Sequence, residues 1–340
     1  MNTHLGIYSP WFQEIVIAME GLGLNRAELL ESHAFNGQLL NAWVEMGIVR
    51  RLWWKAYELS NDPLLGLKVG KKISLRAFNV VAPMLCHSPD LPTALLTIQK
   101  YQSLISQSGR FVITQADSDI QLTYKTSKSH IDTHFTQIDS VFAGSYKLIR
   151  SLLDEQFQLK QLTLTHKLAQ TKKDYEDHFQ CEVMLGQKKA GFVLQSAFQD
   201  INLTTADARI FELCQSLADD RLKHINNSEQ LLNNLSEAIA AQHYRKATLE
   251  QVANQLNLSA RTLQRKLQKQ GINFQQAAEQ VIVREASRLL ENTQLPIFEI
   301  AEKLGYSNTS SFSRAFKTST GNTPGKLRDA TPSLYAGLDE

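Results

Sequence analysis

The chain of 340 residues has few cysteines and no long hydrophobic run. Its three cysteines, Cys86, Cys181 and Cys214, are odd in number and far apart, so we expect neither a disulfide framework nor a zinc site. No apolar segment approaches the roughly 18 residues needed to cross a bilayer. The segment from Met1 to Glu20 lacks a basic start followed by an apolar core. We therefore expect a cytoplasmic protein without a membrane partner.

Motifs of catalysis are also missing. Gly21-Leu-Gly23 follows a helical pattern and not a strand, and no phosphate-cradling or nucleophile-elbow motif occurs elsewhere. His130 and His134 have the spacing of metal ligands on a helix, but no third ligand is evident nearby. The segment around Cys86 does not provide the Pro-Cys-His setting of a DNA-repair alkyltransferase. The sequence predicts no catalytic residue, metal or cofactor; an enzyme of DNA repair or metabolism fused to a DNA-binding domain is the alternative.

Charge is distributed unevenly along a chain that is 43% apolar and long enough for two domains with cores. Residues 242–328 contain 13 Lys or Arg and 6 Asp or Glu, a balance of +7. Residues 1–241 contain 23 basic and 25 acidic residues, a balance of −2. A basic C-terminal region beside a mildly acidic one is typical of phosphate binding.

Two helix-turn-helix patterns lie about fifty residues apart within this basic region. The first has apolar residues at helical spacing, interrupted once by a turn: Leu249, Val252, Ala253, Leu256, Leu258, Leu263 and Leu267. Thr248 and Gln251 predict a capping box, and Ser259 predicts the N-cap of the second helix. Because Leu263 and Leu267 face inward, the outward positions are candidates for base contacts in the major groove: Arg261, Gln264 and Arg265.

The second pattern repeats this plan. Its first helix is expected to begin at Pro296 and to stop at Gly305. Phe312 and Phe316 take the core positions of the next helix, and the outward positions are Thr309, Ser310, Ser313 and Arg314. This face is mostly hydroxylic, so we expect one strong polar anchor, Arg314, and weaker base discrimination.

A single helix is expected between the two patterns. Residues 274–292 contain no glycine or proline and have apolar residues at helical spacing. A helix of this length is about 28 Å long. It would hold the two recognition helices apart, and two such helices on one face of the duplex lie about 34 Å, or about 10 base pairs, from each other.

Residues from about 228 to 328 resemble the DNA-binding domain of the AraC/XylS family of bacterial transcription regulators. The closing signature is Ile300-Ala-Glu-Lys-Leu-Gly-Tyr-Ser-Asn-Thr-Ser-Ser-Phe-Ser-Arg-Ala-Phe-Lys, followed by Gly321-Asn-Thr-Pro-Gly-Lys-Leu-Arg. In that family the outward residues of both recognition helices contact bases, which implies the same role here for Arg261, Gln264, Arg265, Thr309, Ser310, Ser313 and Arg314. Where the family often has tyrosine near the end, this chain has Leu327, a variation in packing. The resemblance implies promoter DNA and RNA polymerase as partners, activation, and a possible homodimer.

The region before the linker is predicted to be α+β. Helices are expected at 11–31, 38–60, 91–105 (capped by Ser88 or Asp90), 133–155 and 205–223, and strands at 110–114, 120–124, 161–166, 182–185 and 191–194. A core role is favoured over a ligand cage for four aromatic residues: Trp43, Trp53, Trp54 and Tyr57.

This region is also similar to the arabinose-binding-like N-terminal domain of one branch of the same family. The similar segments are Asp62-Pro-Leu-Leu-Gly-Leu-Lys-Val-Gly, Ser88-Pro-Asp-Leu-Pro-Thr-Ala-Leu, Leu162-Thr-Leu-Thr-His and Tyr175-Glu-Asp-His-Phe. The resemblance implies sensing of a small metabolite or lipid-like effector of unknown identity, not necessarily arabinose. The motif positions themselves look structural: Pro63, Gly66 and Gly70 shape the backbone, and Leu67 and Val69 are buried.

The predicted fold is an α+β N-terminal effector domain followed by an all-α C-terminal domain with two helix-turn-helix units joined by a long helix. The expected parts are an effector-sensing and dimerisation domain (1–218), a polar linker (219–229), the DNA-binding domain (230–328) and a tail (329–340). The predicted function is that of an effector-responsive transcription activator with sequence-specific DNA binding. An architectural DNA-bending protein is a further alternative, which the large N-terminal core disfavours.

Overall fold

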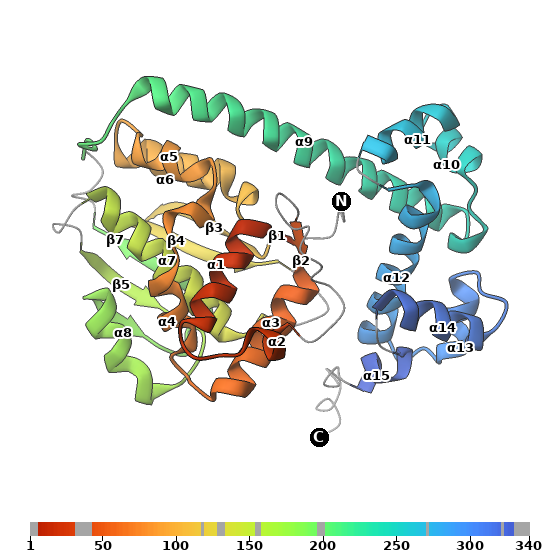
Figure 1. The fold of residues 1–340 in the computed structure, drawn as a ribbon, viewed down its shortest axis with the longest axis horizontal. Helices are drawn as coiled ribbons and strands as arrows, with labels where there is room; N and C mark the ends of the chain where they lie inside the picture. The colour runs from red at the N-terminus through yellow and green to blue at the C-terminus, as the bar shows by residue number, and fades with distance from the viewer. Residues whose placement is uncertain are drawn as a thin grey trace. The chain divides into compact units, whose positions relative to one another are not determined.

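The structure is a computed structural model that describes residues 6–30, 43–116, 119–127, 133–153, 158–195, 201–269, 272–320 and 323–329. The chain packs as two compact units, which divide between Ile225 and Asn226. The first unit contains helices and a sheet, and the second is helical in its described residues (Figure 1). The predicted fold class is confirmed.

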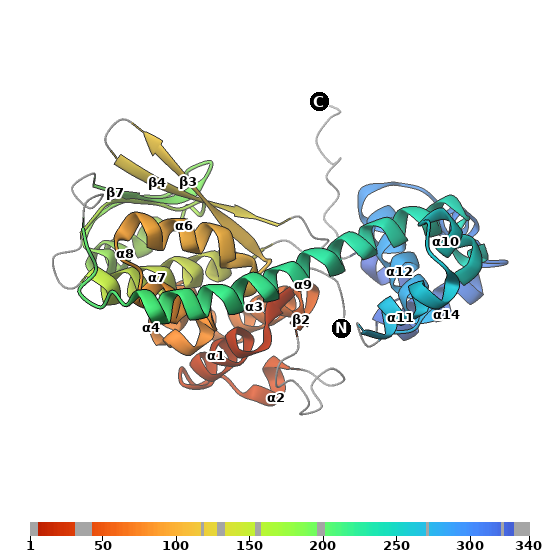
Figure 2. The same cartoon turned by 90° about the horizontal axis from the view of Figure 1, so that it is seen from above.

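A five-stranded sheet forms one layer of the first unit. Its strands are β3 (Gly109–Ala116), β4 (Asp119–Thr126), β5 (Leu159–Thr163), β6 (Glu182–Met184) and β7 (Ala190–Leu194), in the order β3-β4-β7-β5-β6. β5 and β6 are parallel, and the other neighbours are antiparallel. On β4, Ile120 and Leu122 are buried and Gln121 between them is exposed. One face of the sheet is therefore apolar, and Figure 2 shows helices on one side of the sheet.

The second layer consists of helices, with a small additional strand pair. The helices are α1 (Ser9–Glu20), α2 (Arg26–Leu29), α3 (Met46–Ser60), α4 (Leu65–Lys72), α5 (Val81–Cys86), α6 (Leu91–Tyr101), α7 (Phe135–Leu153) and α8 (Lys172–Phe179), and the strands are β1 (Gly6–Tyr8) and β2 (Trp43–Glu45). Helix α7 packs on the large sheet through Phe142. The ring of Phe142 lies 5.7 Å from that of Phe111 on β3 and 4.7 Å from that of Phe192 on β7.

Two glycines allow helix α4 to pack closely on α7. A Cβ atom at Gly66 would collide with the backbone oxygen of Thr136, and one at Gly70 would lie 2.5 Å from the Cβ of Ala143. Since the two glycines are four residues apart, they share one face of α4. Leu67 and Val69 are buried, as predicted. The segment that contains Gly66 and Gly70 therefore has a structural role, which is to allow α4 and α7 to pack closely.

Several predicted helix bounds were wrong. The helix expected at 11–31 is interrupted between α1 and α2, where Gly23 has a φ of +92°. The helix expected at 38–60 begins at Met46, directly after β2, while residues 31–42 lie outside the described residues.

Asp90 caps α6 through a 2.7 Å hydrogen bond that its carboxylate accepts from the Thr93 amide. The alternative cap, Ser88, instead donates its hydroxyl to the Met84 carbonyl.

The expected aromatic core is only partly formed. Trp53 is fully buried, but 47% of Trp54 is exposed, so the prediction fails for Trp54. The ring of Trp54 lies 4.5 Å from the ring of His134, whose burial lowers its pKa to about 4. The side chain of Trp43 and all of His130 lie outside the described residues.

The polar segment that we expected to be a linker is helical. It lies inside α9 (Ala208–Ala241), which continues well beyond the predicted end at Lys223. Ala218 of this helix is buried in the core of the first unit, and Leu235 and Ile239 are buried in the second. One continuous helix thus contributes to both cores.

The second unit consists of the end of α9 and six further helices within the described residues. These are α10 (Leu249–Gln255), α11 (Ala260–Lys269), α12 (Phe274–Asn292), α13 (Ile297–Lys303), α14 (Thr309–Thr320) and α15 (Pro324–Asp329). The predicted span of α12 is confirmed. Among the described helices of the whole chain, none has both the length and the apolar character required to cross a membrane.

We predict that Gly66→Ala destabilises the first unit by about 1 to 3 kcal/mol, because the added methyl group overpacks the α4–α7 contact. All four tryptophans lie between residues 11 and 54, so tryptophan fluorescence during urea unfolding reports on this unit. The control is Gly21→Ala, since a Cβ there meets its nearest atom at an ordinary 3.4 Å. Equal unfolding midpoints for the two variants would contradict the close-packing role of Gly66.

Candidate DNA interface

The first helix-turn-helix unit has the local geometry predicted from its sequence. Thr248 Oγ1 accepts a hydrogen bond from the Gln251 amide at 3.3 Å, and Gln251 Oε1 accepts one from the Thr248 amide at 3.1 Å. This is the predicted capping box of α10. Ser259 Oγ accepts from the Thr262 amide at 3.2 Å where α11 begins. Between the helices, Asn257 adopts a φ of 54°, which sharply redirects the chain.

The second unit reaches the same arrangement with different residues. Pro296 precedes the first residue of α13, and Gly305 follows its end with a φ of +82°, so both predicted boundaries are confirmed. A Cβ at Gly305 would also lie 2.9 Å from the His243 carbonyl oxygen. Asn308, which the sequence analysis missed, caps α14 by accepting from the Ser311 amide at 2.8 Å. An asparagine directly before a helical apolar pattern is the signal that could have identified this cap.

The two turns are closed by equivalent backbone hydrogen bonds. The Leu258 amide donates to the Ala253 carbonyl at 2.9 Å, and the Tyr306 amide donates to the Ala301 carbonyl at 2.9 Å. In each unit the donor directly follows the residue with positive φ, which is Asn257 in the first unit and Gly305 in the second. The second helix of each unit is therefore held by the same kind of turn.

The core positions of the two recognition helices define corresponding surface positions. Leu263 and Leu267 on α11 and Phe312 and Phe316 on α14 are fully or almost fully buried and are spaced alike. When these pairs are matched, three pairs of predicted contact residues correspond: Arg265 with Arg314, Gln264 with Ser313, and Arg261 with Ser310. Thr309 corresponds to Ala260. Arginine is thus the one residue type that both helices place at the same contact position.

The predicted contact residues lie on the accessible sides of their helices. The exposed ones are Arg261, Gln264, Arg265, Ser310 and Arg314, and the half-buried ones are Thr309 and Ser313. Within the described residues, no hydrogen bond or ion pair engages the guanidinium groups of the three arginines. Neither helix contains an acidic residue, and α11 also carries the exposed Lys266. Both surfaces are therefore cationic and available to a polyanion.

Helix α12 contributes to the hydrophobic cores of both helix-turn-helix units. Ala277 and Val281 in its first half are buried in the core that contains Leu263. Ala286 and Leu289 in its second half are buried in the core that contains Phe312. The two recognition helices thus rest on opposite halves of one helix.

The 3-10 turn Tyr244–Lys246 reinforces this connection, and the sequence analysis did not detect its role. Tyr244 packs against both cores. The Arg245 guanidinium lies 4.7 Å from the centre of the Tyr306 ring, and the Arg245 amide donates to the Leu304 carbonyl at 3.4 Å. A short irregular turn has no hydrophobic periodicity, so no sequence pattern indicated these contacts.

A metal site finds no support in the part of the chain that the structure describes. No group of three or more His, Cys, Asp or Glu residues there is placed to hold a metal ion.

Comparison with known proteins assigns both regions. A family model of the arabinose-binding domain of AraC transcription regulators matches residues 23–203, and a helix-turn-helix domain model matches residues 252–330. The chain belongs to the AraC family of transcription regulators. The two helix-turn-helix units are therefore its DNA-binding elements, and the predicted class of DNA-binding regulator is confirmed.

Relatives of this AraC-family chain match it along most of its length. The ornithine utilization regulator of Pseudomonas aeruginosa is 24% identical over 311 residues, which cover 91% of this chain and 92% of that protein. The regulator VirS of Mycobacterium tuberculosis is 24% identical over 289 residues, or 83% of each chain. The crystal structure of the transcriptional regulator CdpR from P. aeruginosa is 20% identical, covers 94% of this chain and 98% of its own, and has a TM-score of 0.50. This last likeness supports the fold.

We predict that Gly305→Ala destabilises the C-terminal unit by at least about 1 kcal/mol, because alanine disfavours positive φ and its methyl group would press on the His243 carbonyl. Thermal unfolding followed by circular dichroism measures the change, while the tryptophan fluorescence transition of the first unit should stay in place. Asn257→Gly is the matched control and is expected to be tolerated, since glycine accepts the same conformation. A Gly305→Ala variant as stable as this control would refute the proposed constraint.

Proposed function

We propose that this protein is an effector-responsive activator of transcription that acts in the bacterial cytoplasm and inserts α11 and α14 into adjacent major-groove segments of promoter DNA. The observation that carries the proposal is the pair Arg265 and Arg314, which occupy corresponding exposed positions on two recognition helices. Arginine donates two hydrogen bonds to guanine in the major groove, a contact that discriminates guanine from other bases.

The two helices are expected to contribute unequally to specificity. On α11, Arg261 and Arg265 can contact guanine and Gln264 can contact adenine. On α14, Arg314 is accompanied only by hydroxyl groups, which contact bases or phosphates with less discrimination: Thr309, Ser310 and Ser313. We therefore expect one strongly and one weakly specified half of the DNA site.

Regulation is assigned to the N-terminal region. We infer that residues 1–218 sense the effector and support a homodimer, and that residues 230–328 bind DNA. An effector acts here by binding one conformation or oligomeric state more tightly than another, which changes the population competent to bind the promoter and to recruit RNA polymerase. A catalytic activity is not part of the proposal, since neither region presents a recognisable catalytic motif.

The test is selection of bound sequences from a randomised duplex pool by the full-length protein at fixed salt. We predict a two-part motif whose halves are centred about 10 base pairs apart. Arg265→Ala should cost about 1 to 3 kcal/mol on this site and relax the preference in the strongly specified half, and Arg314→Ala should do the same in the other half.

Lys266→Ala is the matched control on α11, because Lys266 is exposed but does not share the predicted contact face. It should weaken binding to all sequences alike and reduce the salt dependence by about one phosphate contact. Salt-sensitive binding without any motif would favour the architectural alternative. An equal loss on random and selected DNA would make Arg265 and Arg314 phosphate contacts.

A further inference from the structure

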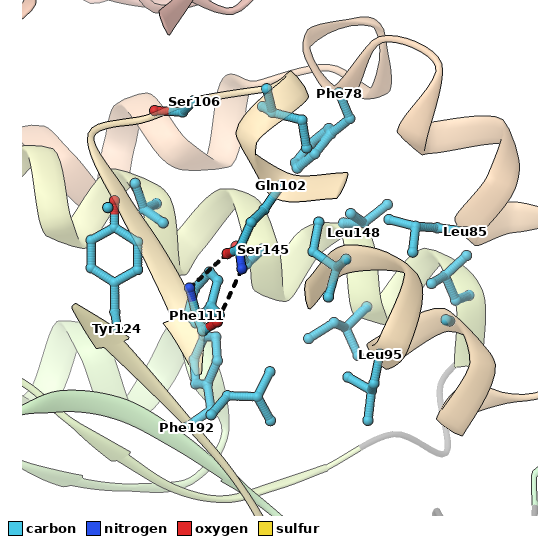
Figure 3. A pocket seen from close by; sticks show the side chains of 18 of the residues that line it. Phe78, Leu85, Leu95, Gln102, Ser106, Phe111, Tyr124, Ser145, Leu148 and Phe192 are labelled. Carbon is cyan, nitrogen blue, oxygen red and sulfur yellow. Dashed lines mark hydrogen bonds between the residues drawn. The ribbon is translucent and has the colours of Figure 1, made fainter. Parts of the chain in front are cut away.

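The first unit contains a partly open cavity of about 90 Å³ between α6, α7 and the sheet (Figure 3). Side chains from several elements line it, and most are apolar. Leu95 and Ile98 come from α6, Leu148 from α7, and Phe111 and Phe192 from the sheet. Trp11 of α1 also lines this cavity. The cavity therefore lies inside the domain to which we assign effector sensing.

The lining contains no charged side chain among the described residues. No carboxylate, ammonium, guanidinium or imidazole group is part of it. The Arg50 guanidinium is not part of the lining and donates to the Ser127 carbonyl at 2.6 Å, although its charge acts on the Tyr124 phenol, which is part of the lining. Burial raises the pKa of the Tyr124 phenol, so this lining group stays protonated and neutral at neutral pH. An ion among these lining residues would lose hydration without a direct contact to a charged side chain.

Some polar lining groups are already engaged within the protein. The Gln102 side chain accepts from the Phe111 amide at 2.7 Å and donates to the Phe111 carbonyl at 3.1 Å, the two bonds drawn in Figure 3. Ser108 Oγ is hydrogen-bonded to Ser106 Oγ at 2.7 Å and to the Tyr124 hydroxyl at 3.2 Å. Gln102 thus fixes the start of β3, and its amide is not free for a ligand.

Ser145 of α7 offers a polar group for a ligand. It lies in the cavity lining and is half-buried. Its hydroxyl forms no hydrogen bond to another of the described residues. An apolar cavity with a small number of neutral hydroxyl groups is suited to orienting a ligand that has one polar group on an apolar body.

We propose that this cavity is the effector site and that the effector is a small, uncharged, mainly apolar molecule with one hydroxyl or carbonyl group, which bonds to Ser145. The proposal rests on the proposed regulatory function and specifies its ligand class. This ligand class does not include ornithine, the amino acid in the name of the P. aeruginosa ornithine utilization regulator, because ornithine carries two ammonium groups and a carboxylate at neutral pH. A protein with the same fold but other residues in the cavity lining would then bind a different chemical class of effector.

The experiment measures binding of matched neutral and charged probes to the full-length protein without DNA. The probe pairs are benzyl alcohol with benzoate and 1-hexanol with hexanoate, and L-ornithine is added as a charged amino acid. Because Trp11 lines the cavity, tryptophan fluorescence reports occupancy, and the thermal midpoint of the same signal reports stabilisation. We expect saturable binding of both alcohols, at least tenfold weaker binding of both carboxylates, and no saturable binding of L-ornithine.

Two variants of α6 locate the binding site. Ile98→Phe adds bulk at the cavity lining and should abolish the fluorescence response to benzyl alcohol. Leu96→Phe makes a comparable change on the same helix, at a residue that is 66% exposed and outside the lining, and should leave the response unchanged. If Ile98→Phe does not fold, Ser145→Ala keeps the test intact. This variant should bind benzyl alcohol several-fold more weakly and should bind toluene, which has no polar group, with unchanged affinity.

The proposal is overturned if a carboxylate or L-ornithine binds as tightly as the alcohols, if no probe binds, or if a folded Ile98→Phe variant binds benzyl alcohol normally. The DNA selection described above is carried out on the same protein and fails independently. A two-part DNA motif together with absent alcohol binding would overturn the ligand class alone. Alcohol binding without any DNA motif would overturn the proposed DNA recognition.

Discussion

Burial of both halves of α12 in two successive hydrophobic cores is the constraint on which the proposed DNA recognition depends. Val281 belongs to the core beneath α11, and Ala286, little more than one turn later, belongs to the core beneath α14. Because a helix of this kind bends only slightly, the two recognition helices cannot change their separation without exposing apolar surface. The Tyr244 side chain, in contact with both cores, adds to this coupling.

The two units reach similar geometry through different chemistry, which explains their expected division of labour. Asn257 and Gly305 provide the positive φ of their respective turns, and Ser259 and Asn308 cap the helices that follow. Their outward faces differ more than their turns. On α11 the outward side chains are long and include two arginines, whereas on α14 Arg314 is accompanied by hydroxyl groups, so the scaffold is shared and the recognition surface is not.

The sequence predicted the C-terminal domain well because its signals are local. Caps such as Thr248 and the uninterrupted apolar period of α12 act within a few residues, and both were located correctly. Tertiary contacts decide the elements that were missed. Helix α4 contains two glycines, and glycine has a low helix propensity. Packing against α7 stabilises this helix. The polar composition of 219–229 suggested a linker, although apolar positions at helical spacing continue on both sides of it within α9. The cavity lining comes from distant segments, so no sequence motif could reveal it.

The most direct test of the fixed spacing is the affinity of the full-length protein for its selected two-part DNA site with base pairs inserted between the halves. An insertion of about 5 base pairs turns the second half to the opposite side of the duplex, and one of about 10 restores its side but doubles the distance. We predict that both insertions reduce the affinity to that of a site with only one half intact. Retained affinity for either insertion would show that the recognition helices move independently and would contradict the role assigned to α12.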